Sequence, residues 1–533
     1  PFGSRQHKLQ PPLMLPRPLF QPAFAANCWS QPSHPAINVV GPVVAVATAV
    51  PAFPTHQFLN YQAADTAAGR QATHATQAGP SSAVQLAVAG AVLTAAGYHD
   101  LRRSRGDRRR IRCAAAVDKP EDENSRNLGV LAEWLMARGT SVSEKIGVVE
   151  DDHTGGGRGL AAAEAFMEDE VVLELPLACC LSAAPGLQAQ LASALPALAE
   201  ASVSGADAAL AVAMATELSL GQSSAWWPYI QSIGQPTRSF PCVFTDEDVG
   251  ALQSVPLAEH FEALSSGLDK LASCSGIDRS QLADAMQLVM TRRFGCEQGN
   301  FMLPIGDLAN HSFYPTCVWD KPTPERQTWR LVAGRGGVQA NEPITRCYCS
   351  DPNHLLLSTA GFIVPGNPFS RIMVKPRQLR ECLTAAIAEG PGAAAPEEFA
   401  KWRREQIEEN LPDPEEDGPG VSMFFVGRHG GGTQWNPLWL NLCGLAMATS
   451  MDAPHWSRRP GGVDEYFGVL ESASWHLFDT TLEEDQEAMK DGGLSNNREL
   501  ALAFRIQQKE VLIEALNGFH KQLTDAAAKA ATA

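Results

Sequence analysis

The sequence predicts an α+β protein in which short strands flank a helical insertion and a helical region follows. Strand-like runs such as 171–176 precede a helix-rich stretch at about 186–295, short strands return between 300 and 365, and helical periodicity then resumes. A chain of 533 residues also exceeds the size of one hydrophobic core. We therefore expect three parts: a disordered leader (1–116), an α+β domain (127–365) and an all-α domain (366–525).

The charge of the chain is unevenly distributed. Residues 1–116 contain eleven Lys and Arg against three Asp, a net of +8, so the remainder carries −25 of the total of −17. A body that acidic would be repelled by nucleic-acid phosphates. We therefore do not expect DNA or RNA as a partner.

The leader resembles a plastid transit peptide. It is poor in acidic residues, and its apolar run Ala83–Gly97 is too short for a comfortable membrane crossing. A basic block follows, and then the small-residue stretch Cys113–Ala116, where processing is plausible. We expect a stromal protein without stable membrane association once processed. The alternative is a disordered tail with one membrane anchor, or a cytoplasmic location.

The twelve cysteines are scattered and include no CxxC pair. A chain of this size does not need disulfides, so we expect reduced thiols in a reducing compartment. A structural zinc site requires four ligands at paired short spacing, and only Cys347 and Cys349 come close. We therefore expect no metal.

Local patterns place the elements of the α+β domain. The apolar spacing predicts a helix over 127–138, with Gly139 as its stop. A glycine loop, Gly155–Leu160, lets backbone N–H groups approach a ligand closely, although most such loops are only turns. The other expected elements are strands at 146–149, 171–176, 317–319, 329–333 and 344–349 and helices at 206–220 and 282–294.

The region after Pro365 is expected to be helical to its end. Its clearest amphipathic segment is Leu500–Phe519, where apolar residues form one stripe and charges lie opposite. Two loops are expected between helices, the acidic Pro412–Gly420 and the Gly430–Gly432 run. The Trp226–Trp227 pair is interpreted as core.

Five motifs occur in the order and approximate spacing of the SET methyltransferases. They are Gly157-Arg158-Gly159-Leu160, Arg292, Asp307-Leu308-Ala309-Asn310-His311-Ser312, Tyr348, and Asn353 with Leu356–Phe362. More narrowly, residues 127–520 resemble the Rubisco large-subunit lysine methyltransferase class, whose C-terminal helical domain binds substrate. The resemblance implies a SET-type β fold with a helical insertion.

The resemblance also implies a role for each matching residue. S-adenosylmethionine would be the cofactor, with Gly157, Arg158 and Gly159 along its methionine part and Arg292 at its carboxylate. Asp307, Asn310 and His311 would complete the cofactor-binding set, with Asn310 and His311 at the adenine end. Tyr348 would be the catalytic residue, and the acceptor would be a protein lysine that must arrive neutral. Rubisco or another plastid enzyme would be the partner, and we expect a monomer.

The chain departs from the family pattern at three positions. Cys349 stands where a Gly normally follows the Tyr, and Leu355 stands where a Glu is usual. Ala360 stands where an aromatic or small polar residue often precedes Gly-Phe. If position 349 had a positive φ, a Cys there would strain the backbone beside the catalytic hydroxyl. One alternative is a SET-derived binding module that has lost turnover. A second is a methyltransferase whose acceptor is histidine, since the branch of the family that this chain resembles includes such members.

Overall fold

The computed structural model describes eight stretches of the chain, and the compact unit that contains them spans Val43–Ala533. The described residues are 123–149, 157–234, 240–389, 397–411, 424–429, 432–446, 462–490 and 493–532. The expected leader, Gly155 and Gly156, and the acidic loop at 412–420 lie outside these ranges.

The first helix, α3 (Glu123–Met136), confirms the helix expected before Gly139. Gly139 has φ +81°, a conformation that glycine adopts without the penalty of a Cβ atom, and it ends this helical segment. Leu131 and Leu135, four positions apart, are both fully buried. The apolar face of α3 therefore packs onto the domain that follows.

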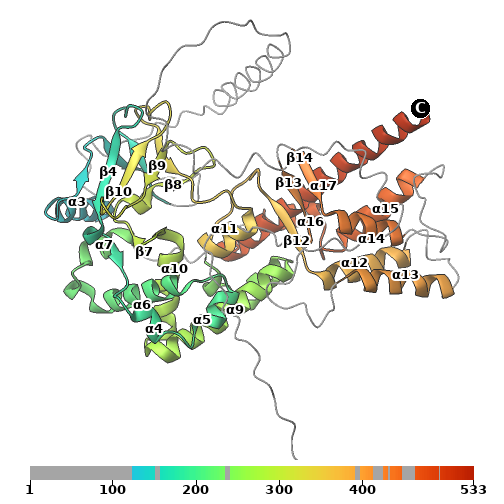
Figure 1. The fold of residues 1–533 in the computed structure, drawn as a ribbon, viewed down its shortest axis with the longest axis horizontal. Helices are drawn as coiled ribbons and strands as arrows, with labels where there is room; N and C mark the ends of the chain where they lie inside the picture. The colour runs from blue at the N-terminus through green and yellow to red at the C-terminus, as the bar shows by residue number, and fades with distance from the viewer. Residues whose placement is uncertain are drawn as a thin grey trace, which may run out of the picture. The chain divides into compact units, whose positions relative to one another are not determined.

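Two four-stranded sheets form the β part, with orders β1-β4-β10-β9 and β2-β3-β11-β8. The first contains β1 (Ser141–Val142), β4 (Val171–Pro176), β9 (Cys317–Asp320) and β10 (Thr328–Ala333). The second contains β2 (Ile146–Val149), β3 (Gly159–Ala162), β8 (Asn310–His311) and β11 (Pro343–Arg346). Strand β10 alternates between buried and half-buried residues, so one of its faces meets the core. Figure 1 shows β4, β10, β9 and β8 gathered in one region.

The predicted helical insertion lies between β5 (Leu181–Ser182) and β6 (Arg293–Cys296), which join β7 (Gly299–Met302) in a third sheet. Its helices are α4 (Leu187–Gln190), α5 (Leu195–Glu200), α6 (Gly205–Leu220), α7 (Trp227–Ile233), α8 (Asp246–Ala251), α9 (Val255–Ser275) and α10 (Arg279–Arg292). Helix α6 starts with a capping box between Ser204 and Asp207, which satisfies backbone N–H groups at its first turn. The fold class is thus α+β, as expected.

The region after Pro365 is mainly helical, but the expectation that it is entirely helical needs correction. Helix α11 (Asn353–Ala360) lies just before this region. The helices within it are α12 (Pro376–Glu389), α13 (Glu397–Asn410), α14 (Pro437–Ala446), α15 (Gly462–Trp475), α16 (Leu482–Ala488) and α17 (Asn496–Thr532). An antiparallel sheet of β12 (Arg371–Val374), β13 (Phe424–His429) and β14 (Gly432–Trp435) lies among them. The Gly430–Gly432 run suggested only a loop, so the pairing of β13 with β14 was missed.

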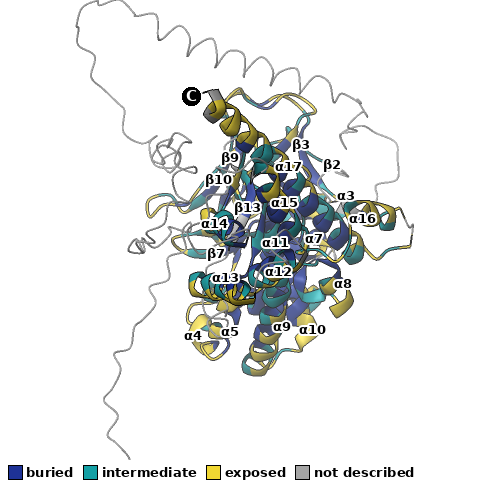
Figure 2. Ribbon diagram, turned by 90° about the vertical axis from the view of Figure 1, so that its right-hand side faces the viewer, coloured by how far each residue is buried: buried dark blue, intermediate teal, exposed yellow. Residues whose placement is uncertain are grey.

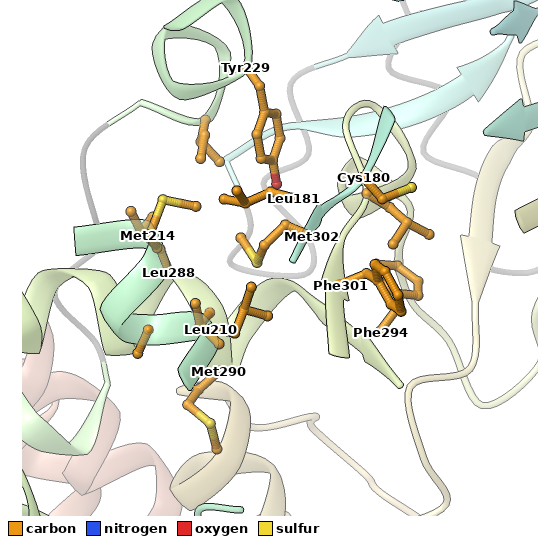
Figure 3. Packing of buried hydrophobic residues seen from close by; sticks show 14 of the residues in the cluster. Cys180, Leu181, Leu210, Met214, Tyr229, Leu288, Met290, Phe294, Phe301 and Met302 are labelled. Atoms are coloured by element: carbon orange, nitrogen blue, oxygen red, sulfur yellow. The ribbon is translucent and has the colours of Figure 1, made fainter. Parts of the chain in front are cut away.

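Buried hydrophobic residues form three clusters. The largest runs from Leu131 to Ile344, and Figure 3 shows part of it, where Leu210 and Met214 of α6 meet Leu288 of α10. A second extends from Ile372 to Leu523, and a third joins α8 and α9 to α11 and α17. The division of the chain near residue 365 stays a prediction.

Helix α17 is anchored by a buried ionic cluster, defined as Asp485, Arg505 and Lys509. The Asp485 carboxylate accepts from Arg505 Nε at 2.8 Å, from Lys509 Nζ at 2.6 Å and from the Thr480 hydroxyl at 2.7 Å. Arg505 also donates to the carbonyl O of Ala251 on α8, at 2.9 Å. The cluster therefore ties α16 and α17 to the insertion, whereas 524–529, near the far end of α17, are exposed (Figure 2).

Within the described ranges, no helix has the length and apolar character needed to cross a membrane. The ten cysteines there are free thiols. No group of three or more His, Cys, Asp or Glu side chains in these ranges is arranged to hold a metal ion.

Candidate active site

Strands β8 and β11 bring the Asn-His-Ser segment beside the segment that contains Tyr348. They pair in parallel, with Asn310 opposite Thr345 and His311 opposite Arg346. The backbone N–H of Ser312 donates to the carbonyl O of Arg346 at 2.9 Å. The chain therefore leaves β11 next to His311, where Tyr348 follows.

Tyr348 is held at both ends by the Asn-His-Ser segment. Its backbone N–H donates to His311 Nδ1 at 3.1 Å, and its hydroxyl donates to the carbonyl O of Ala309 at 3.2 Å. Burial raises the pKa of Tyr348, and the positive charges of Arg346 and Arg292 oppose that rise only in part. The hydroxyl therefore stays protonated at neutral pH and is fixed in direction.

The imidazole of His311 is neutral, and one of its two ring nitrogens, Nε2, has no hydrogen-bond partner among the described residues. Because Nδ1 accepts from Tyr348, the proton of the neutral ring is on Nε2. Burial, together with the charge of Arg346, lowers the pKa of His311 to about 4. Nε2 is buried and has no hydrogen-bond partner among the described residues. A buried donor in this condition suits a ligand that brings an acceptor.

Asp307 joins two side chains of the helical insertion. Its carboxylate accepts from the Tyr229 hydroxyl at 2.8 Å and lies 3.4 Å from Nη1 of Arg292, the last residue of α10. Burial raises the pKa of Asp307, while Arg292, Tyr229 and Arg158 hold it down. Both partners of the Asp307 carboxylate are protein side chains, so Asp307 orients the Arg292 guanidinium.

The glycine segment lies against the same site through Arg158. The Asn310 side-chain amide donates to the carbonyl O of Arg158 at 3.1 Å. Arg158 Nη2 donates to the carbonyl oxygens of Ser232 and Ile233, at 2.8 and 3.1 Å, near the C-terminal end of α7. Gly159 is buried in β3, whereas Gly157 is exposed and has φ +65°. Of the predicted site residues, Gly157 alone is exposed.

Backbone strain lies at Ile305 and not at Cys349. Ile305 has φ +66°, which is an outlier for a β-branched residue, whereas Cys349 is not among the residues with positive φ. Next to it, an added Cβ on Gly306 would approach the Trp319 ring within 2.7 Å. The concern about Cys349 as a strained position is therefore removed, and the tight turn before Asp307 is the strained part of the site.

Sequence reasoning missed two residues of the site. Tyr229 lies beside the Trp pair that we interpreted as core, and it is fully buried in the hydrophobic cluster (Figure 3). Its hydroxyl nevertheless donates to the Asp307 carboxylate. Arg346 stands between the rings of Phe294 and Tyr348, with Cζ 4.0 and 3.8 Å from their centroids. The available signal for Arg346 was a charge at the end of an apolar strand, directly before the Tyr348 segment.

The C-terminal segment is similar to a known protein family. Residues 472–512, which contain the buried ionic cluster, match the family model described as Rubisco LSMT substrate-binding. The resemblance to that class is confirmed. No curated protein matches the chain.

The chain is also similar to solved structures of LSMT. One is the SET domain of LSMT bound to lysine and AdoHcy, with 17% identity, 75% of this chain and 92% of that chain covered, and a TM-score of 0.47. Another is Rubisco LSMT bound to AdoMet, with 16% identity, 74% and 92% covered, and a TM-score of 0.48.

Proposed function

We propose that the chain is an S-adenosylmethionine-dependent protein-lysine N-methyltransferase whose acceptor is a non-histone protein of the plastid. The observation that carries the proposal is the pairing of β8 with β11, where Tyr348 is hydrogen-bonded to His311 and Ala309. The Arg292 guanidinium and the buried Nε2 of His311 belong to the same site. The substrate-binding match at 472–512 supports a protein as the substrate.

The residues present fit the proposed cofactor. Its carboxylate calls for a cation, and the guanidinium of Arg292 is oriented by Asp307. Its adenine offers nitrogen acceptors, and His311 Nε2 is a buried donor without a partner among the described residues. Gly157 and Gly159 have no Cβ, so a ligand can approach their backbone closely. When bound, the cofactor supplies an electrophilic methyl group on a sulfonium.

The chain's own residues would align the acceptor and stabilise the reacting group. The Tyr348 hydroxyl is committed to the Ala309 carbonyl, so its oxygen lone pairs are fixed in direction. Oxygen lone pairs stabilise the partial positive charge of a methyl group in flight, and alignment of the reacting atoms lowers the barrier by several kcal/mol. The lone pair of a neutral acceptor nitrogen would form the new N–C bond, and the proton that the nitrogen loses would pass to solvent before the transfer.

The acceptor must lose its proton before it reacts. Bringing an ordinary lysine from a pKa of about 10.4 to the neutral form at pH 7 costs about 4.6 kcal/mol. Groups near Tyr348 that disfavour an ammonium lower this cost. His311 adds no positive charge at neutral pH, because its pKa is lowered to about 4.

The test is transfer of a labelled methyl group from S-adenosylmethionine to proteins of a plastid stromal extract, read by peptide mass spectrometry. We expect methylated lysine with the wild-type chain and strongly reduced transfer with Tyr348→Phe. Arg335→Met, which removes an exposed charge outside the site, should transfer as the wild type does. Methylation of histidine with unmodified lysines would replace the acceptor we propose, and no transfer at all would reject the enzyme.

A further inference from the structure

Arg346 is a half-buried cation in direct contact with the residue proposed to be catalytic. It ends β11, and its guanidinium lies between two aromatic rings, with Cζ 3.8 Å from the centroid of Tyr348 and 4.0 Å from that of Phe294. Phe294 is itself fixed by edge contacts with Trp319 and Trp329, at 5.2 and 5.9 Å between centroids. The position of the guanidinium is therefore set on one side by the hydrophobic core and on the other by Tyr348.

No carboxylate forms an ion pair with Arg346 in the described part of the chain. Its Nε is buried without a hydrogen-bond partner there. The nearby carboxylate of Asp307 is engaged by Tyr229 and Arg292. A guanidinium held by ring faces keeps much of its charge unscreened, because the rings shield it from part of the water and the nearby Asp307 carboxylate is shared with Tyr229 and Arg292.

The groups around Arg346 leave an excess of positive charge. The charged or titratable side chains that face this part of the site are Arg158, Tyr229, Arg292, Asp307, His311, Cys347, Tyr348, Cys349 and Asp351. Burial raises the pKa of Tyr229, Tyr348, Cys347 and Cys349, and it lowers the pKa of His311, so all five are neutral at pH 7. Three guanidinium groups, those of Arg158, Arg292 and Arg346, therefore face the two carboxylates of Asp307 and Asp351.

We propose that Arg346 is a positioning residue that holds the Tyr348 ring and, through its fixed charge, keeps an acceptor amine beside the Tyr348 hydroxyl in its neutral, nucleophilic form. This inference rests on the proposed methyl transfer. The proton that the acceptor loses passes to solvent before transfer, and the nitrogen lone pair is then free to form the new bond.

The expected size follows from the geometry. An amine at the Tyr348 hydroxyl would stand about 7 Å from the guanidinium, and at an effective dielectric near 20 two like charges at that distance shift a protonation equilibrium by between about one and two pH units. Loss of the charge should therefore move the apparent pKa of the acceptor upward by about that amount. At neutral pH the transfer rate would fall by about tenfold or more, with recovery at alkaline pH.

Two variants separate the charge from the stacking. Arg346→Met removes the charge and keeps the length of the side chain, whereas Arg346→Lys keeps the charge and removes the planar group that stacks on the ring. The pH profile of transfer should move to higher pH in Arg346→Met. In Arg346→Lys the profile should stay in place while the plateau rate falls. Arg335→Met is the control for loss of a surface charge.

A second readout needs neither cofactor nor acceptor. The pKa of His311, about 4 in the wild type, is lowered in part by the charge of Arg346, so NMR titration should find it higher in Arg346→Met and little changed in Arg346→Lys. His311→Gln identifies the signal. If Arg346→Met unfolds, Arg346→Lys still tests the proposal. A pH profile of transfer that moves in Arg346→Lys, although the charge is retained, would overturn it.

The outcomes distinguish this inference from the proposed function. An active wild type whose pH profile and His311 titration are both unchanged in folded Arg346→Met would overturn the role of Arg346 and leave the methyltransferase intact. A wild type that transfers no methyl group would reject the proposed function and the acceptor part of the inference, even where the His311 titration responds to the charge.

Discussion

Replacing Asp485 with Asn should strongly destabilise the fold, because it removes the only negative charge of the buried ionic cluster. The side chains of Asp485 and Lys509 are fully buried and that of Arg505 is 7% exposed, with nitrogen–oxygen distances of 2.6 and 2.5 Å. Asn has nearly the same volume, so the change is one of charge. Removal of one partner from a buried ion pair costs about 3–5 kcal/mol, because it leaves charge buried without compensation. Here two cations lose their partner, so we expect at least that loss.

Urea denaturation followed by tryptophan fluorescence measures the free energy of unfolding directly. Glu487→Gln is the matched control, since Glu487 forms an exposed ion pair with Lys490 and its loss should cost less than about 1 kcal/mol. A loss for Asp485→Asn that is as small as the control's would refute the reasoning and show that the cluster contributes no net stability.

The pH dependence of this variant has a defined sign. Burial tends to raise the pKa of Asp485, but hydrogen bonds from Arg505, Lys509 and Thr480 outweigh it and lower the pKa below its usual value. The stability from Asp485 is therefore present above about pH 4, the unfolded pKa, and is lost as the pH falls through the lower folded pKa. The difference between wild type and Asp485→Asn should shrink in that acid range.

Further predictions concern the site and its supports. Tyr348→Phe should lower methyl transfer by about a hundredfold while calorimetry finds cofactor affinity nearly unchanged; a comparable loss of affinity would assign Tyr348 to binding instead. Gly306→Ala should lower the free energy of unfolding by about 1–3 kcal/mol, because its Cβ would meet the Trp319 ring, and an unchanged value would show that the ring moves freely. Asp278→Ala should cost about 1 kcal/mol in the same measurement, since Asp278 accepts from Ser280 N–H at the start of α10; no loss would show that water replaces this cap. Burial lowers the pKa of three histidines to about 4, so the unfolded chain binds more protons between about pH 6.5 and 4, and stability should fall as the pH drops through that window. They are His260, His311 and His354. A free energy of unfolding that is flat across this window would contradict the buried neutral state.

The sequence predicted best those elements whose apolar periodicity extends over many residues or whose ends are marked by Gly or Pro. The helix before Gly139, the strand Val171–Pro176 and the helix around Leu500–Phe519 are all present, although α17 extends further at both ends. Strand β11 is shorter than expected and ends at Arg346, because the chain turns away there to place Tyr348. These differences concern boundaries, which local patterns specify poorly.

Contacts between distant segments were beyond what local pattern could predict. The hydrogen bond from Tyr229 to Asp307 spans 78 positions, and strand β12 pairs with β13 although helices α12 and α13 lie between them in the chain. Neither has a periodic signal. His311 and Tyr348 were expected to belong to one site, but through resemblance to a family and not from spacing. Arg346 was missed because a charge at a strand end is ordinarily solvated.

Calorimetric titration of the full chain with S-adenosylmethionine measures whether the site around Asp307, His311 and Tyr348 binds the proposed cofactor. We expect one binding site per chain, with affinity about tenfold weaker in Arg292→Met, because a charge-assisted contact is lost, and unchanged in Arg335→Met. A wild-type chain that binds no S-adenosylmethionine, or one whose affinity is the same in Arg292→Met, would contradict the site described around Asp307, His311 and Tyr348.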